Sequence, residues 1–178
     1  MPKATYQPFL RPALLDVSGC KDYRDERDLF IKIDHILSYS GLEQEFIDLS
    51  INQKGVDLEK MTHAQAEFFF RGCLMALRGN IARLIKNLPH RAFCKLLPDS
   101  DILRWFLGIE RLGGVKAYAK STSDRFAHWL NEDSLQYLNA KLIGLLAHAD
   151  HQSALNLNLS EELDFENVYF DSTLIAPA

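Results

Sequence analysis

The chain has 178 residues, of which 47% are hydrophobic and 25% are charged, a composition typical of a soluble globular protein that buries a core. Its most apolar run, residues 68–77, is short and interrupted by Arg71, and its N-terminus has no apolar signal core. The sequence therefore indicates neither membrane insertion nor secretion. Three widely spaced cysteines without a C-x-x-C pair predict reduced thiols in a cytoplasmic protein rather than a zinc or redox site.

The net charge of -4 conceals a basic middle of the chain. Residues 63–128 hold eleven Lys and Arg against five Asp and Glu, a net charge of +6. The flanks are acidic, with net charges of -3 over residues 1–62 and -7 over residues 129–178. Clustered basic residues are the electrostatic footprint of a surface that binds phosphates. A solvated helical face gives the same clustering, so the charge alone leaves both interpretations open.

The N-terminal part of the sequence predicts an extended arm followed by two helices. Residues 1–24 contain several prolines and Gly19 and show no sustained period, which indicates an extended arm. From about Asp28 onward, apolar residues recur every three or four positions, a spacing that predicts helix. Gly41 marks a break between two helices, and residues 52–57 form a polar turn.

A long helix is predicted next, from His63 to about Leu88, with Thr62 as its N-cap. Gly72 and Gly79 lie inside it, and each costs about 1 kcal/mol relative to Ala in an exposed helix. These glycines therefore indicate close packing against another helix, or, at Gly79, a bend or a helix end.

Three short helices follow, at residues 89–97, 100–108 and 121–131. Joined by tight turns, they suit a helix-turn-helix-like unit whose last helix is the recognition helix, with its N-terminal polar residues presented to DNA. Ser121 and Asp124 match a capping box at the start of that helix. A small helical bundle unconnected with DNA has the same spacing, and this alternative stays open.

Two further groups of residues have structural interpretations. Trp105, Phe106 and Trp129 stand at helical spacing among apolar neighbours, which predicts core positions rather than stacking platforms for bases. His148 and His151 lie one helical turn apart, but without a third ligand nearby they indicate a solvated helix end rather than a metal site.

The C-terminal part predicts one more helix and one strand. The helix begins at Asp133 or Ser134 and ends near His151, and an acidic connector leads to the strand at residues 168–175. Asp171 lies in the middle of this strand, where Asp is disfavoured. It is therefore either a solvent-facing residue on an edge strand or a metal ligand.

Three segments together carry a resemblance to a known family. They are residues 103–108 (LRWFLG), 120–126 (KSTSDRF) and 168–173 (VYFDST). In this order and at this spacing they resemble the N-terminal part of bacterial insertion-sequence transposases of the DDE type. The similarity extends over roughly residues 25–178.

The resemblance implies a mainly α fold with a helix-turn-helix-like unit, ending in the first strand of a truncated ribonuclease H-like domain. Residues 1–24 would form the extended arm and residues 25–155 a helical DNA-binding domain. Residues 156–178 would form a linker and the first strand of an incomplete catalytic domain.

The resemblance also implies a catalytic role for Asp171, as the first of three metal-binding acids. Two Mg²⁺ ions held by such acids activate a water or a 3′-hydroxyl and stabilise the charge on the attacked phosphate. One Asp cannot hold this pair of ions, and the family's second Asp and its Glu lie downstream of the strand. We therefore expect Asp171 to bind Mg²⁺ only in a complete enzyme, and this chain to be inactive in DNA cleavage and strand transfer when alone.

The partner implied for the helical region is double-stranded DNA, in the form of the terminal inverted repeats of the element. The residues expected to contact it are Arg104, Arg111, Lys116, Lys120, Ser121, Thr122, Ser123, Arg125 and His128. A homo-oligomer or a complex with a full-length transposase is a further expectation. Two alternatives stay open: a non-catalytic helical DNA-binding regulator or truncated transposition inhibitor, and a helical protein-protein interaction module without DNA affinity.

Overall fold

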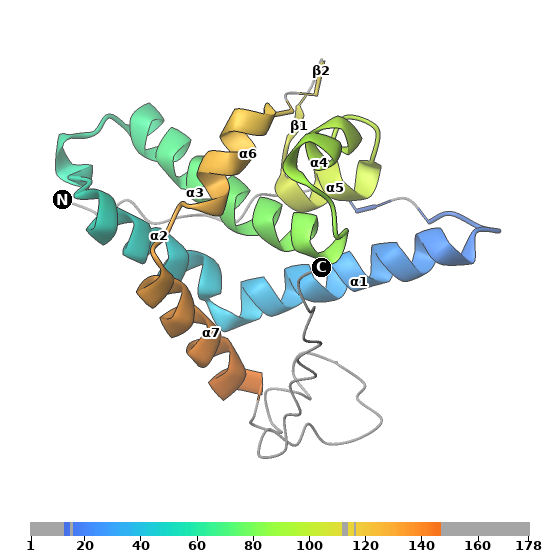
Figure 1. Ribbon diagram of the computed structural model, residues 1–178, viewed down its shortest axis with the longest axis horizontal. Coiled ribbons are helices and arrows are strands. Elements are labelled where there is room, and N and C mark those ends of the chain that lie inside the picture. Colours follow the sequence, from blue (N-terminus) through green and yellow to red (C-terminus); the bar gives the residue numbers. More distant parts are fainter. Residues whose placement is uncertain (1–12, 15, 112–113, 116, 147–178) are drawn as a thin grey trace, which may run out of the picture.

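A computed structural model describes residues 13–14, 16–111, 114–115 and 117–146. Within these residues the protein is mainly helical, as the sequence predicts (Figure 1). The elements in chain order are α1 (Lys21–Ser40), α2 (Leu42–Lys54), the 3₁₀ helix η1 (Leu58–Lys60), α3 (His63–Ile85), α4 (His90–Leu96), α5 (Asp101–Leu107), β1 (Glu110–Arg111), β2 (Gly114–Val115), α6 (Lys120–Ala127) and α7 (Glu132–Leu146). The predicted strand at residues 168–175 lies outside the described residues, as does the predicted helix end near His151.

Local signals in the sequence set several of these boundaries. Gly41 has a left-handed φ of 68° and separates α1 from α2, a conformation that glycine adopts without steric cost. Thr62 starts α3 with a full capping box: its hydroxyl oxygen accepts from the Gln65 N–H, and the Gln65 side chain accepts from the Thr62 N–H. Ser100 caps α5 by accepting from the Leu103 N–H. The predicted starts of α3 and α5 are therefore confirmed.

The first helix begins earlier than its apolar spacing predicts. α1 starts at Lys21, so the last four residues assigned to the extended arm, residues 21–24, are helical. The first turns of α1 are dominated by charged side chains that face solvent, which hides the apolar period. Tyr23 nevertheless packs against the core and extends the buried face of α1 toward its N-terminus.

α3 is the central helix of the molecule. It packs against α2, α5 and α6, while α1 packs against α2 and α5, α4 against α6, and α7 against α2. Figure 1 shows α6 crossing over α3, with α4 and α5 beside it and α7 below α2. The helices of the basic middle of the sequence, α4, α5 and α6, therefore lie together around α3.

Aromatic and aliphatic side chains from several helices meet in the core. Phe30 of α1 and Phe106 of α5 are fully buried, and their rings meet edge to face with centroids 5.0 Å apart. Phe93 and Leu97 from the α4 region are fully buried as well. The predicted burial of Phe106 is confirmed, whereas Trp105 and Trp129 are half-buried and pack against the edge of the core.

A buried arginine joins four helices at the centre of this core. Arg78 of α3 is 4% exposed, and its Nε lies 2.5 Å from Oε1 of Glu43 in α2. Its Nη1 lies 2.6 Å from Oδ1 of Asp34 in α1 and donates to the carbonyl of Phe106 in α5, at 3.0 Å. The guanidinium also lies over the Phe106 ring. The two carboxylates outweigh the cost of burying the cation and hold the pKa of Arg78 above its ordinary value.

The glycines of α3 mark close contacts with the C-terminal half of the domain. A Cβ at Gly79 would lie 2.5 Å from Oη of Tyr118, and a Cβ at Gly72 would lie 3.4 Å from Cη2 of Trp129. α3 continues past both glycines to Ile85. The nearest neighbours thus lie in the segments on either side of α6 rather than in a helix, and the alternative of a helix end at Gly79 is wrong.

The connection between α5 and α6 differs from the predicted tight turn. Residues 108–119 link the two helices and include β1 and β2, which pair antiparallel with Glu110 opposite Val115. By contrast, α4 and α5 are joined by the short segment 97–100. The long connection lets α6 pack on α3 and α4 instead of following α5 directly.

Replacing Arg78 by Met should destabilise the protein strongly. The change removes the guanidinium from two carboxylates that are largely shielded from water, and breaking a buried pair in this way costs about 3–5 kcal/mol of unfolding free energy. Urea denaturation measures this loss. The matched control is Lys60→Ala, which removes an exposed pair with Asp57 and should change the stability by less than about 1 kcal/mol. Equal, small losses for both variants would contradict the central role of Arg78.

Alanine substitutions at two helical glycines should have opposite effects. Gly79→Ala should lower the unfolding free energy by about 1–3 kcal/mol, because the new methyl group collides with the side chain of Tyr118, which packs against the core. Gly144→Ala in α7 meets nothing within 4 Å and should raise stability by up to about 1 kcal/mol through helix propensity. Thermal unfolding distinguishes the two, and a stabilising Gly79→Ala would rule out the close contact.

Candidate nucleic-acid interface

The predicted recognition helix, α6, starts one residue before the predicted capping box. Its N-cap is Ala119, so the assignment of Ser121 as N-cap is wrong. The carboxylate of Asp124 is engaged elsewhere: Oδ2 lies 2.9 Å from Nζ of Lys120, one helical turn earlier. The Lys120 ammonium holds the pKa of Asp124 below its ordinary value of 3.8. Ser121 is left exposed in the first turn.

Ser123 is buried, contrary to its predicted role as a DNA contact. It is 3% exposed, and its hydroxyl lies 2.8 Å from Nδ1 of His90 in α4. It shares the inner side of α6 with Phe126, three residues on, which faces α3. The helical spacing of Ser123 and Phe126 was the signal that could have placed Ser123 on the buried face.

His90 ties α4 to α6. Its Nδ1 meets the Ser123 hydroxyl, and its Nε2 lies 3.6 Å from Oδ1 of Asp124. Cys94 lies one helical turn after His90, and burial raises the pKa of its thiol. Although a serine, a histidine and an aspartate are in line, the serine hydroxyl is covered, so no substrate can reach it as a nucleophile. The cluster positions the two helices.

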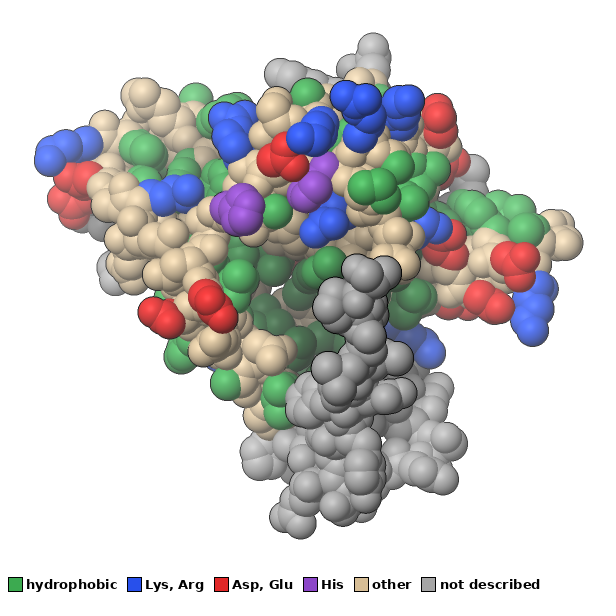
Figure 2. Space-filling model, in the orientation of Figure 1, with side chains coloured by type: hydrophobic (Ala, Val, Ile, Leu, Met, Phe, Trp, Pro, Cys, Tyr) green, Lys and Arg blue, Asp and Glu red, His purple; other side chains and the backbone are tan. Residues whose placement is uncertain are grey.

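Both helices also expose basic side chains to solvent. Arg91 and Lys95 of α4 are exposed one helical turn apart, and Lys120 and Arg125 of α6 are exposed as well. Figure 2 shows Lys and Arg side chains gathered over α4 and α6, with His side chains among them. We call this surface the α4–α6 basic face and define it by Arg91, Lys95, Lys120, Ser121, Arg125 and His128.

The structure divides the predicted DNA-binding residues into several groups. Lys120, Ser121, Arg125 and His128 lie on the α4–α6 basic face. Thr122 is half-buried at its edge and accepts a hydrogen bond from Nη2 of Arg125, at 3.3 Å.

The remaining predicted residues do not lie on this face, or their side chains are not described. The guanidinium of Arg104 is engaged within the α4–α5 turn, where it donates to the Pro98 carbonyl and pairs with Asp101. Arg111 belongs to β1, and its side chain is not described. Lys116 and the predicted metal ligand Asp171 lie outside the described residues.

Sequence reasoning did not single out Arg91 and Lys95, which lie on the α4–α6 basic face. Both were counted in the basic middle of the chain, residues 63–128, but neither was among the individual residues expected to contact DNA. Their spacing of four residues on a short helix, with Phe93 and Leu97 buried on the opposite side, was the available signal.

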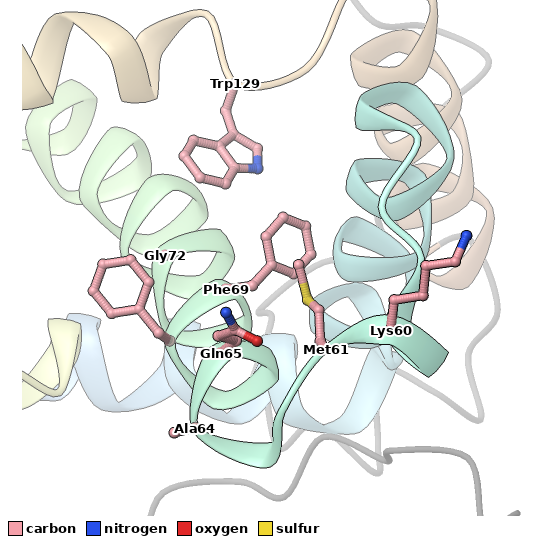
Figure 3. Close-up of a pocket in the computed structure, with 8 residues that line it drawn as sticks. Lys60, Met61, Ala64, Gln65, Phe69, Gly72 and Trp129 are labelled. Atoms are coloured by element: carbon pink, nitrogen blue, oxygen red, sulfur yellow. The ribbon is translucent and has the colours of Figure 1, made fainter.

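An open apolar pocket of about 550 Å³ lies at the other end of α3. Figure 3 shows Trp129 and Phe69 pointing into it beside Met61, and its further lining residues include Phe68, which is 80% exposed, and Lys60. Trp129 is anchored by its Nε1, which donates to the Ser50 hydroxyl, and Lys54 lies over its ring. This lining suits apolar contact rather than acid-base chemistry.

Three comparisons with known proteins, against family models, curated proteins and solved structures, give no match. Within the described ranges, no group of three or more His, Cys, Asp or Glu could hold a metal ion. None of the helices in the described part of the chain is long and apolar enough to cross a membrane.

The three thiols should differ strongly in reactivity. Cys20 is exposed, whereas Cys73 is fully buried and burial raises its pKa to about 11. At pH 8 a thiol of that pKa has a thiolate fraction on the order of 10⁻³, and the thiolate is the reactive form. Titration with a disulfide reagent should therefore modify Cys20 quickly, Cys94 slowly and Cys73 last, with all three reacting at once in denaturant. Reaction of Cys73 at the rate of Cys20 in the native protein would contradict the packing of α3.

Proposed function

We propose that the helical domain binds double-stranded DNA through the α4–α6 basic face. The observation that carries this proposal is that α4 and α6 lie side by side. Their inner residues are held by contacts between the two helices, and their solvent-facing residues include four Lys and Arg. Exposed Lys and Arg on neighbouring helices present several cations to a row of phosphates, which is the main source of affinity in protein–DNA complexes.

The distribution of charge over the chain supports the same surface. The net charge of +6 in residues 63–128 contrasts with the acidic flanks, so the field that attracts DNA is local. The acidic Asp124 beside the face is already paired with Lys120 and lies near His90, which reduces its repulsion of phosphate. The α4–α6 basic face could therefore bind DNA even though the whole chain has a net charge of -4.

We further propose that the chain is the N-terminal part of a cytoplasmic DDE transposase and that its DNA is the terminal inverted repeat of the element. The support is the resemblance of the three segments. The first, residues 103–108, covers most of α5 and fills the core, and the second, residues 120–126, forms most of α6. The third carries Asp171, which would be the first Mg²⁺ ligand in an enzyme that also contains the downstream Asp and Glu.

A second candidate function uses the same surface without catalysis. All six residues of the α4–α6 basic face lie between residues 91 and 128, far in sequence from Asp171. A DNA-binding regulator, or an inhibitor that occupies the ends of an element or pairs with a full-length transposase, would need only this part. DNA cleavage by an extended chain, and its loss in Asp171→Ala, would favour the enzyme.

Neutralising the α4–α6 basic face should weaken binding to duplex DNA and flatten its salt dependence. The test variant replaces Arg91, Lys95, Lys120 and Arg125 by Ala. Each lost phosphate contact should reduce the slope of log K against log salt by about 0.9, and fluorescence anisotropy between low and moderate salt measures it.

A matched control separates the face from the net charge. It replaces four exposed basic residues on other elements by Ala: Lys21, Arg24, Lys32 and Lys60. Both variants lose four positive charges, so their affinities for duplex DNA will differ only if the interface is localised on α4 and α6. We expect the control to bind like the parent chain. Equal weakening in both variants, or a parent chain without salt-dependent binding, would refute the proposed interface.

A further inference from the structure

Resting on the proposed DNA binding, we propose that the two helices of the basic face have different roles. α6 reads base edges in the major groove through Ser121, Arg125 and His128, with Arg125 selecting guanine. α4 contacts the phosphates at the rim of the groove through Arg91 and Lys95. This assignment makes Arg125 the main determinant of sequence preference.

This division of roles follows from the surroundings of α6, which has a buried side, a side that borders α4 and a side exposed to solvent. Ser123 and Phe126 face inward and are buried, and Asp124 with Lys120 borders α4 through His90. Ser121, Arg125 and His128 are exposed, and their spacings of four and three residues place them in one stripe. The stripe is centred opposite the buried side, so it is the part of α6 that points most directly away from the domain.

The dimensions of α6 fit the major groove. An α-helix with its side chains is about 10–12 Å across, which matches the groove width of about 12 Å, and the eight residues of α6 extend about 12 Å at 1.5 Å per residue. Because stacked base pairs are about 3.4 Å apart, the stripe can cover three to four of them.

The position of α4 fits the rim of the same groove. Packed helices lie about 8–10 Å apart, so a neighbour of a helix inserted in the groove lies over the phosphate backbone rather than over bases. α4 packs against α6, and its exposed residues Arg91 and Lys95 are long cations suited to phosphates.

The chemistry of Arg125 favours guanine among the bases. A guanidinium donates two parallel hydrogen bonds to O6 and N7 of guanine, the commonest base-specific contact. In the free protein the guanidinium of Arg125 donates a hydrogen bond to Thr122 at the edge of the face, and this bond is exposed, so DNA can replace it. Lysine keeps the charge but loses the bidentate geometry, which makes Arg125→Lys the informative substitution.

The experiment uses the full 178-residue chain and duplexes selected from a random library. Affinity is measured at one salt concentration for the selected duplex and for a scrambled duplex of equal length. Arg125→Lys should lower the preference for the selected duplex by roughly 10- to 100-fold and leave affinity for the scrambled duplex within about threefold. The double variant Arg91→Gln and Lys95→Gln should weaken both duplexes equally and reduce the salt slope by about 1.8. Melting temperatures near that of the parent show that each variant is folded.

The outcomes separate this inference from the proposed function. If the parent binds duplex DNA in a salt-dependent way but selects no sequence, or if Arg125→Lys keeps the full preference, the reading role of α6 is refuted and DNA binding stands. If the α4 variant alone loses sequence preference, the two roles are reversed and the inference is wrong. If the parent binds no duplex, both the inference and the proposed function fail.

Discussion

The ion pairs of Arg78 are the constraint on which the rest of the structure depends. This one guanidinium joins Asp34 of α1 and Glu43 of α2 to α3, and donates to the Phe106 carbonyl of α5. A cation buried in this way is tolerated only when its partners are held at hydrogen-bonding distance. These contacts therefore hold the four helices together, and the Phe106 ring against the guanidinium meets the Phe30 ring edge to face.

The side of α3 that does not meet α1 and α2 carries the proposed interface. Asn80 donates through Nδ2 to the Phe126 carbonyl at 2.7 Å, and the close approach at Gly79 admits Tyr118, so α6 and the segment before it lie directly on α3. His90 then holds α4 against α6 through Ser123 and Asp124. A rigid inner side allows the outer side chains to be placed with little loss of entropy on binding, which is the physical advantage of mounting an interface on packed helices.

The sequence predicts the helices well where a local signal is strong. The capping box of Thr62 and Gln65, the cap at Ser100 and the left-handed Gly41 each act within a few residues, and each is found in the structure. The predicted cap at Ser121 fails because Asp124 is drawn to Lys120 and His90, and the second of these comes from a helix 34 residues earlier. The hairpin of β1 and β2 has too few residues to show a strand period.

The candidate site was predicted only in part, because it depends on contacts between segments that are distant in the sequence. Charge clustering locates the basic middle of the chain, but it does not say which cations face solvent. Arg78 lies in the same basic segment and is buried in a salt bridge, and Arg104 pairs within the turn before α5. Arg91 and Lys95 join the proposed interface only because α4 lies beside α6. The roles of basic residues depend on tertiary contacts, which local periodicity does not contain.

The most direct measurement of the central claim is an NMR titration of the ¹⁵N-labelled chain with a short duplex. If the α4–α6 basic face binds DNA, the largest amide shift changes fall in residues 90–95 and 119–128, while α2 and α7 keep their shifts. Changes concentrated in α2, in α7 or around the pocket of Phe68 and Trp129, with residues 90–95 and 119–128 unchanged, would contradict it.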